Sequence, residues 1–445
     1  MFDLDFTHDP KRTSWVESAN DHSDFPIQNL PFGVYQSKDG SARIGIAIGD
    51  QILDAQSVVA AGLVSDSETQ ASLGESNLNR VMSLNKSQRI KLRHELSNLL
   101  ASDSDVDQGK LTLVAQSDVA MLMPCRIGDY TDFYASIYHA TNVGSMFRPN
   151  NPILPNYKHI PIGYHGRASS VVPSGTTFRR PVGQKAPAEE GGNSTRSPSA
   201  LLDYEFEVGF FVAEGNELGS TVSIDEIEDK IFGMTLVNDW SARDLQKWEY
   251  QPLGPFLAKS FATTVAPWVV TMEALAPFRC AEFQRPDGDP EPLDYLTNSK
   301  NKTSGGVNIQ LEAFLTSSKM REQSSEPVRL SKTTFTNMYW TIAQMLTHHC
   351  SNGCNMQPGD LLASGTVSGP GRDERGCMLE LTWNGDRNNP LPGSDRTPLK
   401  LPTDEERKFL ADGDEVILKG YCESETHRRI GFGDCAGVIE ESATA

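Results

Sequence analysis

The chain has little that would hold it in a membrane or tie it together with disulfides. No apolar run in its 445 residues approaches the roughly 20 residues of a membrane span. Residues Met1 to Phe6 lack the basic and apolar blocks of a secretory signal. The seven cysteines, an odd number at irregular spacings, argue against a disulfide scaffold. We therefore expect a soluble, cytoplasmic protein with reduced thiols.

Positive charge is also in short supply. The chain has 59 acidic and 40 basic residues, which gives a formal net charge of −19. Such a surface opposes binding to nucleic acid or to anionic membranes, so neither partner is expected. An anionic small-molecule substrate would need a local pocket of Arg and Lys side chains.

The usual signatures of nucleotide and serine chemistry are missing as well. The sequence has no phosphate loop, no Gly-rich nucleotide fingerprint and no regular alternation of strands and helices. Gly365–Gly369 has the wrong spacing for a nucleophile elbow. His348–Cys354 is dense in soft metal ligands, but no second pair follows at zinc-site spacing. The end of an amphipathic helix near Gly353 is the favoured interpretation of that stretch.

What is present is a strand-rich chain in two parts. Phe32–Tyr35 and Ala42–Ala55 alternate like short strands joined by Gly and Asp turns, and Leu78–Leu100 has the apolar spacing of a helix. After Pro124, short apolar runs separated by Gly and Pro predict a β-rich domain, and Gln184–Pro198 has the composition of a flexible loop. We predict an N-terminal module over residues 1–120 and a larger domain over residues 121–445.

Asp129–Arg148 concentrates chemistry, because it places carboxylate, phenol, imidazole and guanidinium groups within twenty residues. If Asp129 caps a helix, Asp132 and His139 lie about two helical turns apart and can point the same way. They would then serve as a metal ligand and a proton acceptor. The alternative is a local capping role for Asp132 and a surface position for His139.

A pair of glutamates follows further on. Glu205 and Glu207 are separated by one residue in an apolar run, so both would lie on one face of a strand. A hard cation such as calcium or magnesium would offset their repulsion, whereas the alternative is a solvated strand face. Asn238–Tyr250 mixes acidic, basic and aromatic residues again, and its alternative is a solvated amphipathic helix. With Asp132 and Asp239, the two glutamates could supply an oxygen-only metal site.

One further carboxylate stands in apolar surroundings. Met378–Trp383 places Glu380 in an otherwise apolar predicted strand. If it is buried, Glu380 needs a partner, and His139 would suit. By spacing alone, a Glu380 that faces water is favoured. The segments Pro255–Thr264 and Leu361–Gly371 fit a pocket around a metal, since Gly-rich turns let the backbone approach a ligand.

This ordered set of segments resembles the fumarylacetoacetate hydrolase family. The resemblance covers most of residues 120 to 437. It implies a mainly β chain with a small SH3-like N-terminal barrel, a mixed β-roll C-terminal domain with peripheral helices, and a homodimer. The segments that carry it are Asp129–Arg148, Leu154–Ser170, Glu205–Glu207, Asn238–Phe261, Met338–Trp340, Leu346–His349, Gly359–Thr366, Met378–Glu380 and Gly431–Gly437.

The resemblance also implies an activity. Members of this family hydrolyse the carbon–carbon bond of 4-fumarylacetoacetate to fumarate and acetoacetate, the last step of tyrosine and phenylalanine catabolism, with a bound metal. One alternative is another reaction of the superfamily, namely decarboxylation, hydration or isomerisation of a different β-keto acid. A second alternative is a non-catalytic metal-binding scaffold, which would not require a base and its partner. The combination of His139 and Glu380 favours hydrolysis.

By motif position, the resemblance assigns roles to particular residues. His139 corresponds to the general base, with Glu380 as its orienting partner, and Arg243, Gln246 and Lys259 could bind the developing oxyanion. The positions that match substrate contacts are Tyr134, Arg148, Tyr164, Gln246, Tyr250 and Thr366. The positions that match Ca2+ ligands are Asp132, Glu205, Glu207 and Asp239, and an Mg2+ site is implied around Asp239, Lys259 and Thr263. Because a protonated amine is a poor ligand, any metal contact of Lys259 is expected through its backbone carbonyl.

Overall fold

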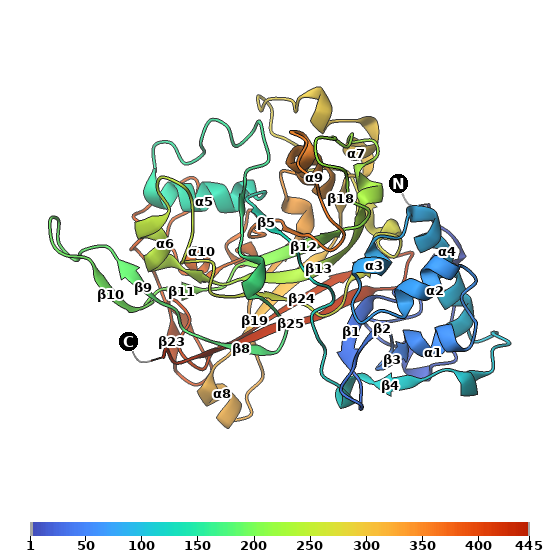
Figure 1. Ribbon diagram of the computed structural model, residues 1–445. Coiled ribbons are helices and arrows are strands. Elements are labelled where there is room, and N and C mark those ends of the chain that lie inside the picture. The colour runs from blue at the N-terminus through green and yellow to red at the C-terminus, as the bar shows by residue number, and fades with distance from the viewer. Residues whose placement is uncertain (1–2, 444–445) are drawn as a thin grey trace.

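The computed structural model describes residues 3–443 and shows a mainly β fold (Figure 1). The predicted fold class is confirmed in that respect. Two large sheets form the body, and a smaller N-terminal unit packs at one end of it (Figure 1). Among residues 3–443, no helix combines the length and apolarity needed to cross a membrane.

The N-terminal unit is an antiparallel sheet accompanied by helices. Its strand order is β1-β2-β3-β4, and the strands are β1 (Phe32–Gln36), β2 (Ala42–Ile48), β3 (Gln51–Asp54) and β4 (Leu113–Ala115). Its helices are α1 (Ala55–Ala60), α2 (Ser67–Leu73), α3 (Asn79–Met82) and α4 (Lys86–Leu100). The helix expected over Leu78–Leu100 is therefore two helices, because Asn85 and Gln88 form a capping box that starts α4. The SH3-like description of this unit stays a prediction.

The larger sheet of the body carries the candidate site. Its order is β6-β5-β21-β12-β13-β15-β7, with β16 added beside β13. The pairs β21–β5 and β15–β7 are parallel, and the other pairs are antiparallel. The strands are β5 (Tyr130–Phe133), β6 (Gly163–His165), β7 (Val171–Pro173), β12 (Phe206–Val212), β13 (Ile231–Asp239), β15 (Thr263–Val265), β16 (Val270–Thr271) and β21 (Leu361–Ala363).

A second sheet packs against the first, and in Figure 1 its two long strands run close to β12 and β13. Its order is β20-β19-β24-β25-β8. Phe210 and Met234 from the first sheet and Leu418 and Phe432 from the second lie fully buried in one shared core. The strands are β8 (Thr176–Arg179), β19 (Gln310–Thr316), β20 (Val328–Thr334), β24 (Glu415–Cys422) and β25 (Ile430–Glu440).

Short elements surround the two sheets. Two-stranded pairs are β9 (Val182–Lys185) with β10 (Thr195–Pro198), β11 (Leu202–Asp203) with β14 (Ser241–Ala242), β17 (Arg279–Cys280) with β18 (Gly306–Val307), and β22 (Leu399–Lys400) with β23 (Glu406–Arg407). The peripheral helices are α5 (Ile137–Phe147), α6 (Arg243–Glu249), α7 (Ser299–Ser304), α8 (Ser318–Glu322), α9 (Ile342–Cys350) and α10 (Met378–Leu381).

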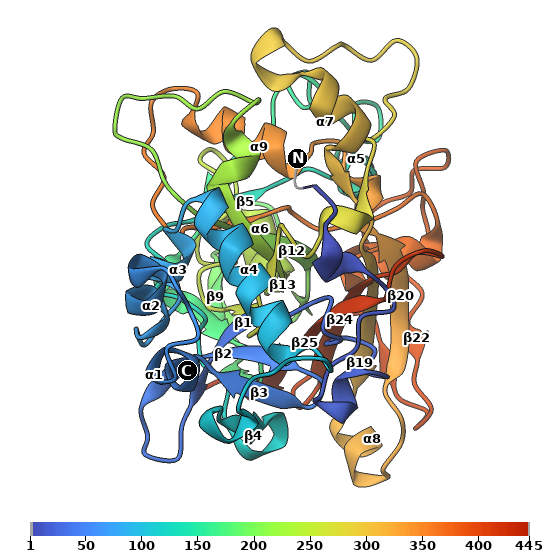
Figure 2. The ribbon, with the colours of Figure 1, turned by 90° about the vertical axis from the view of Figure 1, so that its right-hand side faces the viewer.

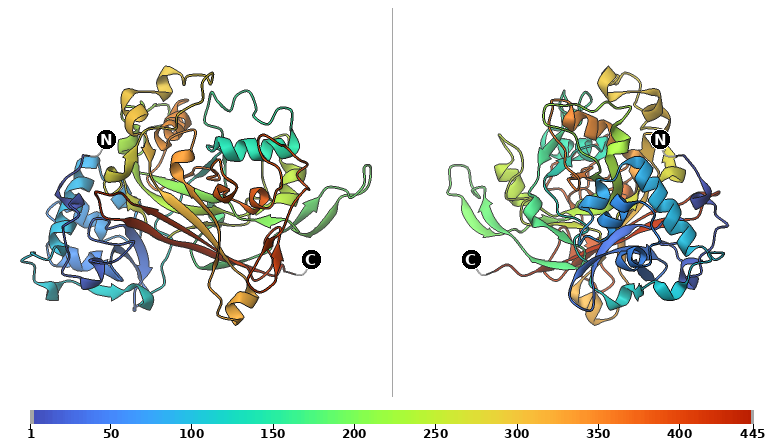
Figure 3. Two further views of the ribbon diagram at one scale, coloured as in Figure 1. Left: turned by 180° about the vertical axis from the view of Figure 1, so that it is seen from behind. Right: turned by 45° about the vertical axis from the view of Figure 1, so that its right-hand side comes forward.

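The segment expected as a loop over Gln184–Pro198 is a loop over residues 186–194, but its two ends pair as the strands of a hairpin. Strands β9 and β10 project from the body in Figure 1 and Figure 3. At its base, Lys185 forms an ion pair with Asp244 of α6 at 2.9 Å. These strands could not be recognised from the sequence, because their polar residues lack the apolar alternation that usually identifies a strand. Backbone hydrogen bonds and the ion pair of Lys185 with Asp244 hold the hairpin instead.

Strand β12 is buried on both of its faces. Phe210 contributes to the core between the two sheets, whereas Phe211 belongs to the core shared with the N-terminal unit. Figure 2 shows that unit in front of the larger sheets. Burial on both faces explains why this strand reads as a continuous apolar run, and it makes any charged residue at its start a buried charge.

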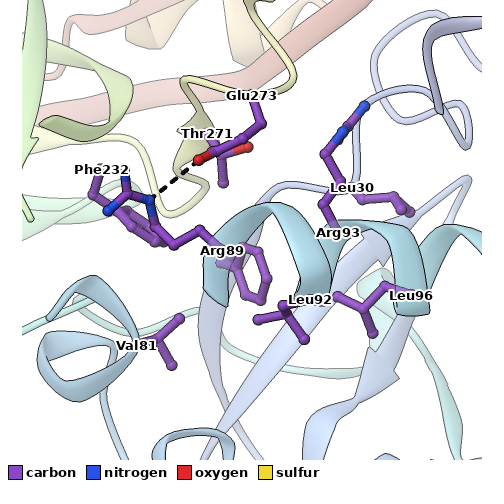
Figure 4. Close-up of a pocket in the computed structure, with 10 residues that line it drawn as sticks. Leu30, Val81, Arg89, Leu92, Arg93, Leu96, Phe232, Thr271 and Glu273 are labelled. Carbon is purple, nitrogen blue, oxygen red and sulfur yellow. Dashed lines mark hydrogen bonds and ion pairs between the residues drawn. The ribbon is translucent and has the colours of Figure 1, made fainter. Parts of the chain in front are cut away.

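The contact between the N-terminal unit and the body encloses a buried ion pair. Arg89 of α4 donates from Nε to Oε1 of Glu273 at 3.2 Å, as Figure 4 shows, and the two side chains are 3% and 5% exposed. The cavity beside them measures about 10 Å³, which is the lower limit for one water molecule. The pair is therefore shielded from bulk solvent.

We expect Arg89→Met to destabilise the protein by about 3–5 kcal/mol, because it leaves the Glu273 carboxylate buried without its cation. Urea unfolding of Arg89→Met, Glu273→Leu and the double variant forms a double-mutant cycle. The changes in unfolding free energy of the two single variants should be far from additive. The matched control is Arg80→Met, since Arg80 pairs with Glu68 at 2.9 Å on the surface and should change the midpoint little. Additive effects at Arg89 and Glu273 would contradict the role assigned to this pair.

Candidate active site

Four buried carboxylates meet where β5, β12 and β13 lie near one another. Asp132 is in β5, Glu207 is in β12, Asp239 ends β13, and Glu205 directly precedes β12. Each offers a carboxylate oxygen, and these oxygens all lie within 4.8 Å of one another. The four residues are at most 5% exposed, so the alternative of a solvated strand face for Glu205 and Glu207 is wrong.

The route by which Asp132 reaches this cluster differs from the one expected. The helix predicted to start at Asp129 does not form, because Tyr130–Phe133 pairs as strand β5 with both β6 and β21. Helix α5 begins later, where the Ser136 side chain accepts a hydrogen bond from His139 N at 3.2 Å. Asp132 and His139 thus come from a strand and a helix that face the same centre, not from one helical face.

The cluster holds more negative charge than its surroundings neutralise. Burial raises the pKa of Asp132 well above its usual value, and the charge of Asp239 adds to the rise. Burial likewise raises the pKa of Glu207, and Asp132 adds to it. Asp132 Oδ1 and Glu207 Oε1 are buried without a hydrogen-bond partner among the described residues. Such orphaned acceptors are costly unless a ligand meets them.

Two cationic side chains reach the cluster from one side. Lys259 Nζ donates to Glu205 and, at 2.6 Å, to Asp239 Oδ2. Arg243 Nη1 lies 2.7 Å from Glu205 Oε1, and Arg243 Nε donates to Asp203 Oδ2 at 2.9 Å. Burial opposes the charge of Glu205, but Arg243 and Lys259 outweigh it and lower the pKa of that carboxyl. These two cations neutralise the charge of Glu205. The orphaned oxygens of Asp132 and Glu207 still have no hydrogen-bond or ionic partner among the described residues.

The donor set therefore suits a hard divalent cation. Oxygen donors from four carboxylates, two of them with unsatisfied oxygens, are the ligands that such ions take in proteins. Thr263 Oγ1 donates to Asp239 Oδ1 at 3.1 Å, so its hydroxyl supports a cluster ligand. The Lys259 amine is engaged with carboxylates and, being protonated, offers no lone pair to a metal.

A second buried pair lies beside the cluster. His139 Nδ1 and Glu380 Oε2 are 2.5 Å apart, and the two side chains are 4% and 0% exposed. The other ring nitrogen, Nε2, lies 3.9 Å from Glu205 Oε1 and so faces the carboxylate cluster. Because an ionised Glu380 can only accept, the proton of a neutral His139 sits on Nδ1, and Nε2 is left with a free lone pair.

Glu380 is held by three further donors. Asn142 Nδ2 donates to Oε1 at 2.8 Å, Ser368 Oγ donates to Oε2 at 2.8 Å, and the Cys377 thiol lies 3.2 Å from Oε2. Burial opposes ionisation of Glu380, but the charge of His139 and hydrogen bonds from His139, Asn142 and Cys377 lower the pKa of Glu380 to about 2.

The strand expected around Glu380 is wrong, because Met378–Leu381 forms the short helix α10. Its first amide groups are capped from elsewhere in the chain. Asp203 Oδ1 accepts from Met378 N at 2.7 Å and Asp203 Oδ2 accepts from Leu379 N at 3.0 Å. A cap supplied by a residue far away in the sequence leaves no local signal. The expectation that Glu380 faces water is wrong as well.

Two aromatic residues predicted to contact substrate lie at the same centre. The Tyr134 ring meets the His139 ring edge-on, with centroids 5.4 Å apart. Tyr164 OH donates to Asp239 Oδ2 at 3.0 Å. Burial raises the pKa of both phenols, so both remain hydrogen-bond donors at neutral pH.

The turn after β21 brings a further predicted residue inside. Thr366 is 2% exposed, and its Oγ1 has no partner among the described residues. Gly365 makes this turn with φ of 76°, and a Cβ there would lie 2.2 Å from the Phe133 carbonyl oxygen, so only glycine fits. Its amide donates to Glu207 Oε2 at 3.1 Å, which fixes that carboxylate.

The remaining predicted residues differ in how closely they join the site. Gln246 Oε1 accepts from Arg243 Nη1 at 3.1 Å, so Gln246 belongs to the centre. Arg148 donates to the Pro152 carbonyl at 3.3 Å, and its Nε is buried without a partner in the described chain. Tyr250 is 36% exposed, and its hydroxyl accepts from the neighbouring Gln251 at 3.2 Å. Tyr250 therefore has no described bond to the carboxylates.

The histidines at the end of α9 take no part in this centre. His349 bonds to Thr131 Oγ1 at 2.8 Å and His348 bonds to Tyr295 OH at 2.9 Å. Neither belongs to a group of three or more metal-ligand side chains found within residues 3–443. Helix α9 starts at Ile342, where Thr341 caps it, and it ends at Cys350, close to Gly353 as expected.

Some residues of the centre are not apparent from sequence reasoning. Asn142 follows His139 by three positions on one helix, and this spacing is a usable signal. Asp203 ends β11, Ser368 lies in the loop after β21, and Cys377 directly precedes α10. These three residues meet only in the folded chain, and no local pattern marks them.

Comparison with known proteins places the chain in a family. The family model described as fumarylacetoacetase N-terminal matches residues 28–124, and the one described as fumarylacetoacetate (FAA) hydrolase C-terminal matches residues 130–439. The chain is 47% identical over 435 residues to the fumarylacetoacetase of Bos taurus, which covers 96% of this chain and 98% of that protein. It is 49% identical over 434 residues to the fumarylacetoacetase of Caenorhabditis elegans, with 95% and 98% covered.

A solved structure supports the fold. The fumarylacetoacetate hydrolase of Exiguobacterium antarcticum superposes with a TM-score of 0.50 at 16% identity, covering 93% of this chain and 99% of that one. At this identity the likeness concerns the fold alone. Together with the two family models and the near full-length relatives, it shows that the chain belongs to the fumarylacetoacetate hydrolase family.

Proposed function

We propose that this chain hydrolyses the carbon–carbon bond of 4-fumarylacetoacetate and releases fumarate and acetoacetate, the last step of tyrosine and phenylalanine catabolism. The observation that carries the proposal is the buried pair of His139 and Glu380, whose free Nε2 faces a cluster of carboxylates. Near full-length identity to relatives named fumarylacetoacetase supports the same substrate.

In this proposal His139 is the general base. Water is a poor nucleophile at neutral pH. His139 Nε2 therefore takes a proton from the water molecule while the water oxygen attacks the substrate carbonyl carbon. Glu380 Oε2, 2.5 Å from Nδ1, accepts the Nδ1 hydrogen bond and stabilises the imidazolium that forms. Cleavage of the carbon–carbon bond leaves its electron pair on the acetoacetate fragment, and the imidazolium can return the proton there.

Arg243, Gln246 and Lys259 are proposed to stabilise the oxyanion formed by this attack. One such donor contributes about 3 kcal/mol to lowering the barrier. Burial opposes the charge on Lys259, but Asp239 and Glu205 outweigh it and raise the pKa of the amine. Lys259 is therefore protonated at neutral pH and can act as a hydrogen-bond donor.

We further propose that the carboxylate cluster holds Ca2+ and that Mg2+ is held around Asp239, Lys259 and Thr263, with Lys259 using its backbone carbonyl. When bound, a divalent ion would act as a Lewis acid on the β-diketone oxygens. The Ca2+ ligands are proposed to be Asp132, Glu205, Glu207 and Asp239.

Substrate recognition is proposed to rest on residues around this centre. Arg148 can pair with a substrate carboxylate, because its Nε is buried and unpaired in the described chain. This local cation would overcome the acidic net charge of the protein. Tyr134, Tyr164, Thr366 and Gln246 would line the inner part of the substrate site, and Tyr250 its rim.

The organisation of the chain is also a proposal. We divide it into an N-terminal domain, residues 1–120, and a catalytic domain, residues 121–445, a boundary that lies a few residues before the gap between the two family matches at residues 125–129. We propose a homodimer, to which exposed apolar side chains such as Leu253 (95%) and Phe256 (68%) could contribute. All seven cysteines are free, which supports a cytoplasmic location.

The test is to add purified protein to 4-fumarylacetoacetate and follow its ultraviolet absorbance. We expect loss of absorbance with fumarate and acetoacetate in equal amounts, and no loss in a sample treated with chelator. Release of carbon dioxide would point to decarboxylation, and an absorbance change without fragmentation would point to hydration or isomerisation. No change with folded, metal-loaded protein would reject the substrate.

A further inference from the structure

We propose that Asn142, Ser368 and Cys377 act as positioning residues that fix the Glu380 carboxylate, so that Glu380 in turn fixes the orientation and tautomer of His139. We call these three side chains the Glu380 cradle. The inference rests on the proposed function in so far as it takes His139 to be the base of the reaction.

The cradle satisfies both oxygens of Glu380. Oε1 accepts from Asn142 at 2.8 Å, and Oε2 accepts from Ser368 at 2.8 Å, from Cys377 at 3.2 Å and from His139 at 2.5 Å. Glu380, Ser368 and Cys377 are fully buried, and Asn142 is 7% exposed. With water excluded, a lost donor leaves part of a buried charge unmatched, and this cost is larger than that of an exposed hydrogen bond.

The direction of these hydrogen bonds follows from the remaining contacts. Ser368 Oγ accepts from Gly376 N at 3.0 Å, so its own proton is available for Glu380. Burial, together with the charge of Glu380, raises the pKa of the Cys377 thiol, which therefore stays protonated. Every neighbour of the carboxylate in this cradle is thus a donor. Four donors can be satisfied together only if Glu380 is ionised.

The cradle is also anchored to the backbone around it. Ser368 O accepts from Ser136 Oγ at 2.9 Å, and Ser136 caps the helix that carries His139 and Asn142. Arg375 Nη1 donates to the Glu380 carbonyl at 2.7 Å. The loop after β21, the start of α5 and α10 are thereby joined at one point. A displaced Glu380 would let the His139 ring rotate, and Nε2 of His139 would no longer face the carboxylate cluster.

The kinetic test replaces Asn142 with leucine, which has a similar size but no donor. We expect kcat to fall by about 10- to 100-fold, which corresponds to the usual free-energy contribution of a hydrogen bond to a charged group. KM should change less than about 3-fold. Cys377→Ala should lower kcat several-fold and Cys377→Ser should restore it, since the hydroxyl keeps a donor. Ser145→Ala is the matched control, because it removes a buried hydroxyl from α5 that bonds to Thr141 O and not to Glu380.

The spectroscopic test does not depend on turnover. The short bond between His139 Nδ1 and Glu380 should give a proton resonance far downfield of the amide region, absent in His139→Ala. We expect this resonance to shift in Asn142→Leu and Cys377→Ala and to stay in Ser145→Ala. If folded Asn142→Leu keeps both the wild-type kcat and the wild-type resonance, the cradle is overturned.

The remaining outcomes are also decisive. If Asn142→Leu fails to fold by circular dichroism, the pair Cys377→Ala and Cys377→Ser decides through kcat and the resonance, and identical behaviour of the two variants overturns the proposal. If the wild-type protein does not cleave 4-fumarylacetoacetate, the proposed function fails, and the resonance alone then tests the cradle.

Discussion

Replacing His139 by alanine is expected to lower kcat for 4-fumarylacetoacetate by about 10²- to 10⁴-fold, the range that general acid–base catalysis contributes. The substitution removes the Nε2 lone pair that faces the cluster but leaves the four carboxylates in place. Steady-state kinetics should therefore show a large loss in kcat, while metal content measured by mass spectrometry stays at the wild-type level.

The matched control for this variant is His159→Ala, which removes an exposed histidine and should leave kcat unchanged. Circular dichroism and thermal unfolding should show that His139→Ala remains folded. Wild-type turnover by the folded variant would remove His139 from the mechanism. Unfolding of the variant would instead indicate that the pair with Glu380 is structural.

Features governed by local spacing could be predicted from the sequence. Glu205 and Glu207 share a face because strand side chains alternate, and their repulsion alone indicates a cation. The structure places both on that face and buries them. The same rule works for β1 and β2, whose alternating residues gave the N-terminal strands correctly.

Features set by distant parts of the chain could not be predicted in this way. Glu380 lies on a helix because Asp203, 175 residues before Met378, caps it. Asp132 lies on a strand because two partner strands, β6 and β21, supply its hydrogen bonds. Each segment alone is compatible with another local structure, and tertiary pairing decides between them. Asp132 and Glu380 are therefore site residues whose local structure was predicted wrongly, because their secondary structure depends on distant parts of the chain.

Replacing Glu207 by glutamine should weaken divalent-ion binding by more than about 100-fold, since even indirect changes around metal ligands cost about 10- to 100-fold. Glu207 Oε1 is one of the two orphaned oxygens of the cluster, and the amide keeps the shape while removing the charge. Isothermal titration with Ca2+ and with Mg2+ measures the loss, and turnover should fall with it. Glu214→Gln is the control, because Glu214 is 57% exposed and outside the cluster.

The difference in thermal stability between Glu207→Gln and the wild-type protein should change sign when a divalent ion is added. Without a divalent ion, Glu207 adds to the repulsion that raises the pKa of the buried carboxyls, so Glu207→Gln should unfold at a higher temperature than wild type in chelator. The amide oxygen can still accept from Gly365 N, and its NH2 group can meet the orphaned Asp132 Oδ1. With saturating Ca2+ the wild-type protein should unfold at the higher temperature, since it binds the ion more tightly than Glu207→Gln and is stabilised more by it. A purely structural hydrogen-bond network would instead make Glu207→Gln the less stable protein in both conditions.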